Sequence, residues 1–220
     1  PLAAQAWRDL AQGGGLLVAA AAVGSGQQGL YLSTDGGLSW QSASAPQGRS
    51  YSAVSVSASG RVIAALDGSD FALLSASQLA HLDPTVIPTL KTAQIAALNT
   101  EQIVALSTAQ VSGLTTLQLL ALGSSGIAAL QTEDLAVLKS AQLVALATDQ
   151  IAALSSEQIA SLTTSQIAAL STRQVAEGLT TAQIAALTTN QVRAGLTTAQ
   201  AAALTTEQIE ALNTEHIASL

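Results

Sequence analysis

The chain lacks the side chains on which much protein chemistry depends. Its 220 residues include no Cys and no Met, and only 2% are aromatic and 10% charged, against about 25% charged in an ordinary soluble domain. Without Cys there is no disulfide scaffold, thiolate metal site or cysteine nucleophile. Seven Lys and Arg stand against fourteen Asp and Glu, a net charge of −7, and with no basic stripe the sequence predicts no nucleic-acid binding.

What is present is apolar: 49% of the residues are hydrophobic, which excludes disorder of the highly charged, weakly hydrophobic kind. The apolar run at residues 16–23 is eight residues long, whereas a spanning helix needs about 20. Elsewhere Ser, Thr or Gln recurs every few residues. We therefore expect no membrane span, and the start at Pro1, without a basic segment, predicts no signal peptide.

Residues 1–74 hold most of the glycines and all five aromatic residues. Short apolar runs separated by Gly and Ser predict strands and turns there. The runs lie at residues 16–20, 29–33, 51–57 and 61–66. Residues 7–20 also resemble residues 51–65, and this offset of about 44 residues is the size of a propeller blade.

Between the two copies lies Ser33-Thr34-Asp35-Gly36-Gly37-Leu38-Ser39-Trp40. This segment resembles the Asp-box, S-x-D-x-G-x-T-W, of sialidase-like (BNR) β-propellers, with Ser39 in place of the usual Thr. An Asp carboxylate can accept N–H groups across such a turn, glycines supply positive φ, and a Trp packs over the hairpin. The resemblance implies a structural role, away from the catalytic site of that family, for Ser33, Asp35, Gly37, Ser39 and Trp40.

This resemblance covers about 70 residues, and the second copy breaks off where a second Asp-box should start. Two blades cannot close a propeller, which needs about four to eight. Sialidase-like catalysis would require an arginine cluster, and the region contains only Arg8, Arg49 and Arg61. We expect a non-enzymatic, blade-like antiparallel β module.

From Ser75 onward the sequence repeats every eight residues as (S/T/N)-T-x-Q-(I/V/L)-A-A-L, through eighteen units. Every unit has an aliphatic residue after the Gln position and ends on Leu. The Gln position is occupied by Gln in fourteen of the units. The steps lengthen to nine residues at Gly178 and Gly195, where we expect a glycine with positive φ to absorb the extra residue.

The period favours short helices over strands or one long helix. In a strand the Ile and the Leu three residues later would point to opposite faces, whereas in a helix they share one. In one continuous helix, eight residues drift by about 80° per unit, so no single apolar seam could form. The sequence predicts a short helix in each unit and a bend between units.

Capping residues place the bend. In Leu98-Asn99-Thr100-Glu101-Gln102-Ile103, Asn99 would be the N-cap, Gln102 the N3 partner of a capping box, and Leu98 and Ile103 a hydrophobic staple. Asp83-Pro84 fits an N-cap and N1 pair. Gln131, Lys139 and Ala147 are poor caps and weaken three of the expected starts.

These patterns predict an α+β chain. Residues 1–74 would form the β module and residues 75–220 a solenoid of short α-helices, with Ile and Leu columns inside and Thr and Gln columns outside. Stacking of neighbouring units must supply the stability, because such helices are not stable alone. The alternative is a β-solenoid with two octads per coil, against which the abundance of Ala, Gln and Leu argues.

Residues that could carry chemistry are few. His81 and His216 are far apart in sequence and are expected to be capping or surface side chains, and Glu133-Asp134 a solvated helix start. Asp67 and Asp70 lie in an expected turn with too few oxygen ligands for a strong calcium prediction. We expect no catalytic, metal-binding or cofactor-binding residue.

Long T-x-Q-I-A-A-L arrays resemble repeat segments of large bacterial surface or secreted, adhesin-like proteins, which implies an extracellular or cell-surface location. The expected function is that of a structural repeat protein of the cell surface or extracellular matrix. It would form an extended rod or a self-assembling filament subunit, because low charge gives weak protection against association. The alternative is an adhesive or glycan-binding surface module.

Overall fold

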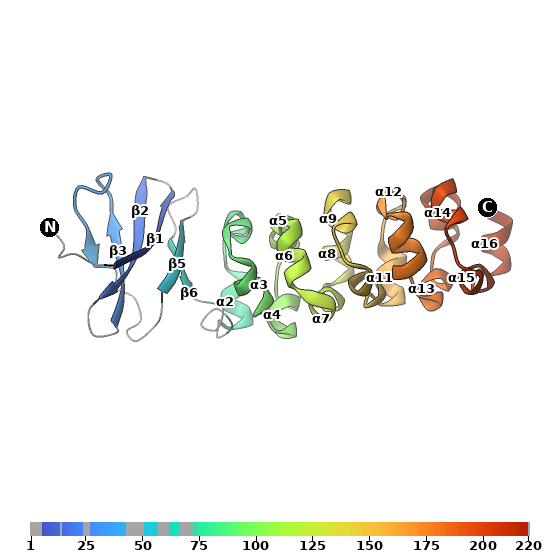
Figure 1. The fold of residues 1–220 in the computed structure, drawn as a ribbon, viewed down its shortest axis with the longest axis horizontal. Helices are drawn as coiled ribbons and strands as arrows, with labels where there is room; N and C mark the ends of the chain where they lie inside the picture. Colours follow the sequence, from blue (N-terminus) through green and yellow to red (C-terminus); the bar gives the residue numbers. More distant parts are fainter. Residues whose placement is uncertain are drawn as a thin grey trace. The chain divides into compact units, whose positions relative to one another are not determined.

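The structure is a computed structural model that describes residues 6–13, 15–23, 27–42, 51–56, 62–66, 72 and 74–219. Its chain forms two compact units, residues 1–99 and residues 100–220. Strands make up the first part of the first unit, and short helices follow to the end of the chain (Figure 1).

The first sheet is antiparallel, with the strand order β1-β2-β3-β4. Its strands are β1 (Ala6–Gly13), β2 (Leu16–Val23), β3 (Gln27–Ser33) and β4 (Gln41–Ser42). The apolar run that is too short for a membrane helix forms β2, one of the two inner strands, in which Val18 and Ala19 are buried. Gly15, with φ of 77°, makes the tight turn between β1 and β2.

A second hairpin pairs β5 (Tyr51–Val56) with β6 (Val62–Leu66), and β5 contacts β1 and β2. The pairing register shifts between Trp7 and Asp9 in β1 and between Tyr51 and Ala53 in β5. These shifts fall at corresponding positions of the two copies of the internal repeat, so both hairpins have an irregularity of the β-bulge type at the same place. The expected antiparallel strands are thus confirmed.

Helices fill the chain from Ala76, and the α+β class and the helical repeat are confirmed. In the first unit they are α2 (Ala76–Ala80), the 3₁₀ helix η2 (Pro84–Thr89) and α3 (Thr92–Ala96). The type of secondary structure changes between Leu66 and Ala76, whereas the compact units divide after Asn99. A domain boundary between residues 74 and 75 stays a prediction.

The second unit consists of helices of five or six residues, one per repeat. They are α4 (Thr100–Val104), α5 (Thr108–Gly113), α6 (Thr116–Ala121), α7 (Gly123–Ala128), α8 (Thr132–Ala136), α9 (Ser140–Val144), α10 (Thr148–Ala152), α11 (Ser156–Ser161), α12 (Thr164–Ala169), η3 (Gln174–Gly178), α13 (Thr181–Ala185), η4 (Gln191–Gly195), α14 (Thr198–Ala202), α15 (Thr206–Glu210) and α16 (Thr214–Ser219).

These helices wind into a coil. Helices three repeats apart contact each other, as α8 does α11 and α9 does α12, and α11, α13 and α15 lie in one row in Figure 1. The aliphatic residue after the Gln position and the unit-ending Leu fill the interior: Ile151 is 0% exposed and Leu154 3%. Burying one such pair contributes about 3–6 kcal/mol before conformational entropy is counted, so the stack supplies what a helix of five residues lacks.

The expectation for the nine-residue units is wrong. Gly178 and Gly195 are not among the glycines with positive φ, which in the described residues are Gly15, Gly36, Gly37 and Gly123. Instead η3 and η4 are π-helical turns, in which the N–H groups of Leu179 and Leu196 donate to the carbonyls of Gln174 and Gln191. A π turn widens the helix by one residue, so the extra residue is absorbed inside the helix.

The two glycines are needed for close packing. A Cβ on Gly178 would lie 3.2 Å from Cβ and Cγ2 of Ile151 and 3.3 Å from the carbonyl oxygen of Thr148. Gly195 approaches Ile167 equally closely. The π turns therefore press directly against the preceding turn of the coil.

Gly178→Ala should destabilise the chain by about 1–3 kcal/mol, because the atoms it meets belong to backbone and to a Cβ-branched side chain that cannot move away. Urea unfolding of both proteins would measure the change. The matched control is Glu177→Ala, which removes one end of an exposed ion pair with Arg173 and should change the stability by less than about 1 kcal/mol. Equal stability of Gly178→Ala and the wild-type chain would contradict the packing described here.

Candidate functional site: the glutamine ladder and the Asp-box-like turn

The glutamines of the repeat are buried, so the expectation that they form an outer column is wrong. From Gln94 to Gln208 each repeat glutamine is at most 6% exposed. Gln166, for example, is 4% exposed, whereas Thr163 beside it lies at the surface. A buried amide must have partners for both its donor and its acceptor, and the coil provides both.

The acceptor of the amide serves the start of its own helix. Oε1 of Gln166 accepts the backbone N–H of Thr163 at 2.8 Å, and the hydroxyl of Thr163 accepts the N–H of Gln166 at 3.2 Å. This reciprocal pair is the expected capping box, and it recurs from Ser75 with Gln78 to Thr205 with Gln208. The predicted register of the helix starts is confirmed.

The donor of the amide reaches the preceding turn of the coil. Nε2 of Gln166 donates to the carbonyls of Leu135 at 2.8 Å and Leu138 at 2.9 Å, which are 31 and 28 residues earlier. Both separations lie between three and four eight-residue units, so the coil closes one turn in that interval. We call the glutamines that make such bonds the glutamine ladder.

Nine glutamines between Gln142 and Gln208 make such bonds. The shortest bond of each Nε2 is 2.6–2.9 Å long. The members are Gln142, Gln150, Gln158, Gln166, Gln174, Gln183, Gln191, Gln200 and Gln208.

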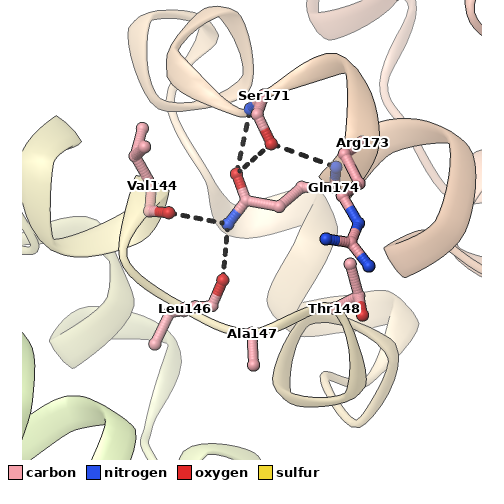
Figure 2. A pocket seen from close by; sticks show the side chains of 7 residues that line it. All are labelled: Val144, Leu146, Ala147, Thr148, Ser171, Arg173 and Gln174. Atoms are coloured by element: carbon pink, nitrogen blue, oxygen red, sulfur yellow. Dashed lines mark hydrogen bonds between the residues drawn. The ribbon is translucent and has the colours of Figure 1, made fainter.

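Figure 2 shows one member of the ladder, Gln174, with its partners. Oε1 of Gln174 faces the N–H and hydroxyl of Ser171, and Nε2 faces the carbonyls of Val144 and Leu146. The hollow beside Gln174, about 320 Å³ in volume, is lined by Thr148 and Arg173 among others. The polar atoms of the Gln174 amide are already used, and Arg173 pairs with Glu177, so the hollow shows no set of side chains arranged for a ligand.

Helices also begin where the cap residue is poor. Lys139 and Ala147 offer no side-chain acceptor to their helices, yet α9 and α10 start there in register. Their backbone N–H groups still donate to Oε1 of Gln142 at 2.7 Å and of Gln150 at 3.1 Å. The glutamine half of the box is therefore enough to hold the start once the coil is packed.

Four of the eighteen units depart from glutamine at this position, with Val86, Gly126, Asp134 and His216. Gly126 is packed so closely that a Cβ there would lie 2.9 Å from Cβ of Leu122. His216 is 3% exposed, so it is a capping residue and not a surface one: its Nδ1 takes the N–H of Asn213 at 3.4 Å, as a glutamine Oε1 would. Asp134 is 2% exposed, so only Glu133 of the expected solvated pair lies at the surface.

Burial raises the pKa of the Asp134 carboxyl above its ordinary value. The N–H of Gln131, which donates to Oδ2 at 3.2 Å, acts against this shift, and the charge of Glu133 adds to it. Asp134 can therefore lose a proton and become charged, whereas the amides of the ladder glutamines stay neutral.

The donor role of the glutamines does not follow from the eight-residue repeat. The carbonyls that accept from Nε2 lie one turn of the coil earlier, and the repeat length does not tell how many repeats make a turn. A signal was present: a capping box accepts Glu as readily as Gln, yet none of the eighteen units has Glu at this position. Only the amide has a donor, so the avoidance of Glu indicates a donor role.

The five residues of the Asp-box-like segment come together in one turn between β3 and β4. The Asp35 carboxylate accepts the Ser39 N–H at 2.9 Å and the Ser33 hydroxyl at 2.7 Å, and the Ser33 hydroxyl accepts the Gly37 N–H at 2.8 Å. Nε1 of Trp40 donates to the Gly37 carbonyl at 3.1 Å. Gly37 has φ of 93°, which only glycine adopts easily. These groups bond to one another, which is the arrangement of a structural turn.

The same hydrogen bonds keep the Asp35 carboxyl ionised. The Ser39 hydroxyl, the Ser39 N–H and the Ser33 hydroxyl hold the pKa of the Asp35 carboxyl well below its ordinary value, because each stabilises the ionised form.

Other polar residues stay apart. Nδ1 of His81 lies 2.7 Å from the carbonyl of Ser77 on its own helix, at the surface. In the described part of the chain, no three His, Asp or Glu side chains lie close enough to hold a metal ion. Asp67, Asp70, Arg49 and Arg61 lie outside the described residues, so the expectations for them stay predictions.

Comparison with known proteins identifies the repeat. The family model described as ALTTAQ repeat matches residues 87–126, 127–164 and 177–206. No curated protein and no solved structure matches the chain. Among the described helices none is long and apolar enough to cross a membrane.

Gln166→Glu should separate the two roles of a ladder residue. Glutamate keeps the capping acceptor but has no donor for the carbonyls of Leu135 and Leu138, so we expect a loss of about 2–4 kcal/mol near neutral pH. Urea unfolding would measure the loss. Ser165→Ala, at an exposed neighbour, is the matched control and should be nearly neutral. If Gln166→Glu were as stable as this control, only the capping role would remain.

Asp35 should stay ionised in acid, below the pH of about 3.9 at which an unperturbed Asp titrates. Its contribution to stability is present above the unfolded-state pKa and is lost as the pH falls through the lowered pKa of the folded chain. The ¹³C shift of the carboxyl carbon, followed by NMR from pH 7 to pH 2, would show this. Ser39→Ala removes the hydroxyl donor to Asp35 and leaves the backbone N–H of residue 39 in place, so it should move the titration upward. An ordinary Asp titration in the wild-type chain would contradict the hydrogen bonding.

Proposed function

We propose that the chain is a non-enzymatic structural repeat protein of the cell surface or extracellular matrix, an extended rod or a subunit of a self-assembling filament. The observation that carries this proposal is the glutamine ladder. Each ladder unit is joined by the same amide to the turn before it, so stability comes from neighbouring units and the array can lengthen without a new kind of contact.

The side chains available for chemistry support a structural role. The buried polar groups of the coil are mostly ladder amides, and these are hydrogen-bonded within the coil. The chain has no Cys and no Met, so it lacks the side chains that oxidise most readily. A chemically inert coil with few charged side chains is suited to bearing load or spacing other parts of an assembly.

Exposed apolar side chains support self-association. Leu117 is 66% exposed and Leu120 40% exposed on α6, and Val144 is 46% exposed on α9. Helices α6 and α9 contact each other, so these side chains lie on neighbouring helices. Exposed apolar groups on a surface with few charges favour contact between copies.

The β module would be a junction or assembly module at one part of the chain. Its self-contained turn at Asp35 and the paired register shifts of its two hairpins support a blade-like module of the Asp-box kind. An adhesin-like context and an extracellular location belong to the same proposal, on the resemblance of the octads.

Negative-stain electron microscopy and sedimentation of the full chain test this function. We expect elongated particles or filaments, and fewer or shorter assemblies for the double variant Leu117→Thr, Leu120→Thr. Val104→Thr, at an apolar side chain that is 43% exposed on α4, is the matched control and should assemble normally.

A compact globular monomer would contradict the proposal. Saturable binding on a glycan array by a chain that does not assemble would point instead to the adhesive or glycan-binding alternative.

A further inference from the structure

Asp134 is a carboxyl group where the coil otherwise places an amide. It is 2% exposed, the same burial as Gln150 and Gln183, and its unit starts α8 in register. It keeps the acceptor role of a ladder residue, since its Oδ2 accepts the backbone N–H of Gln131 at 3.2 Å.

The donor role at this position is open. Ladder glutamines donate to carbonyls 28 and 31 residues earlier, as Gln166 does to Leu138 and Leu135. For Asp134 the same separations give the carbonyls of Leu106 and Ile103. An ionised carboxylate has only acceptors, whereas a protonated carboxyl has one O–H donor.

A neighbouring side chain partly replaces the missing donor. Nε2 of Gln131 donates to the carbonyl of Val104 at 2.9 Å, the residue between the two carbonyls that a ladder amide would bind. This bond ties the unit to the preceding turn from the surface, and it leaves the buried position to Asp134.

We propose that Asp134 is an acid-sensitive joint of the coil, whose carboxyl donates to the preceding turn when protonated and loses that bond when ionised. The joint lies between the turn that contains α4 and the turn that contains α8. In acid Asp134 binds the preceding turn as a ladder glutamine does. At neutral pH it holds its unit to that turn less firmly than the glutamines of the ladder hold theirs.

The charged groups around Asp134 also disfavour its ionisation. On α8 itself Glu133 is adjacent; α5, which packs against α8, has no titratable side chain; α11, which packs on the other side, has Glu157; and α4 has Glu101. All of these titratable groups are acidic, so none of them favours ionisation of the buried carboxyl.

The raised pKa of Asp134 decides how the stability of the folded chain changes with pH. The folded chain holds the proton of Asp134 at a higher pH than the unfolded chain, because burial raises the pKa. The stabilisation is therefore fully present below the unfolded-state pKa and is lost as the pH rises through the folded-state pKa.

The test compares the full chain with Asp134→Asn and Asp134→Gln from pH 3 to pH 7. Asn has the shape of the protonated carboxyl but does not titrate, and Gln is the ladder residue itself. We expect wild type and Asp134→Asn to be equally stable at low pH, and the unfolding constant of the wild type to become about fivefold larger than that of Asp134→Asn at neutral pH, for one lost hydrogen bond.

A local readout separates the joint from global effects. Amide hydrogen exchange of Gln131, corrected for its intrinsic pH dependence, should slow in acid in the wild type and stay level in both variants. Glu157→Gln removes an exposed carboxyl of α11 and should leave the wild-type pH profile in place. The proposal is overturned if Asp134→Asn retains the wild-type pH dependence, or if Asp134→Gln is less stable than the wild type at neutral pH.

Discussion

In each repeat of the glutamine ladder, one amide group holds together two parts of the chain that are far apart in sequence. In each ladder glutamine the oxygen completes the capping box of its own helix, and the nitrogen donates to carbonyls of the turn before it. The side chain is buried, so leaving either half unpaired would be costly. The position therefore needs a side chain with a donor and an acceptor on one planar group, which the Gln amide provides at any pH and a carboxyl provides only when it is protonated.

The other features of the coil depend on this bond. Helices of five or six residues are unstable alone, but those of the ladder are fixed at their first turn by the glutamine and are covered by Ile and Leu columns. Because Gln142 and Gln150 supply half of the cap, the chain tolerates Lys139 and Ala147 as cap residues. The two nine-residue units form the π turns η3 and η4. Gln183 and Gln200, which follow them, still donate to carbonyls of the preceding turn.

The sequence predicts the local structure of this chain well, because local structure depends on neighbours a few residues apart. The strands, the helix starts near Asn99 and Ser107, and the inward Ile and Leu follow from period and capping. The burial of the glutamines does not, since the partners of Gln166 are 28 and 31 residues away and an octad is silent on the length of a turn. The close packing of Gly178 against Ile151 and the burial of Asp134 do not follow from the octad for the same reason, because both depend on how the turns stack. At the Asp35 turn the hydrogen bonding was predictable, because it spans at most four residues.

Hydrogen exchange of the glutamine side-chain amides, resolved by NMR in the full chain, tests the ladder most directly. The account predicts that the NH₂ groups of Gln142, Gln166 and Gln183, which are buried and donate across turns, exchange far more slowly than that of Gln78, which lies at the surface. Slow exchange should disappear together with the folded coil. If the buried and the exposed glutamines exchange at the same rate while the helices are intact, the amides do not join the turns and the account is wrong.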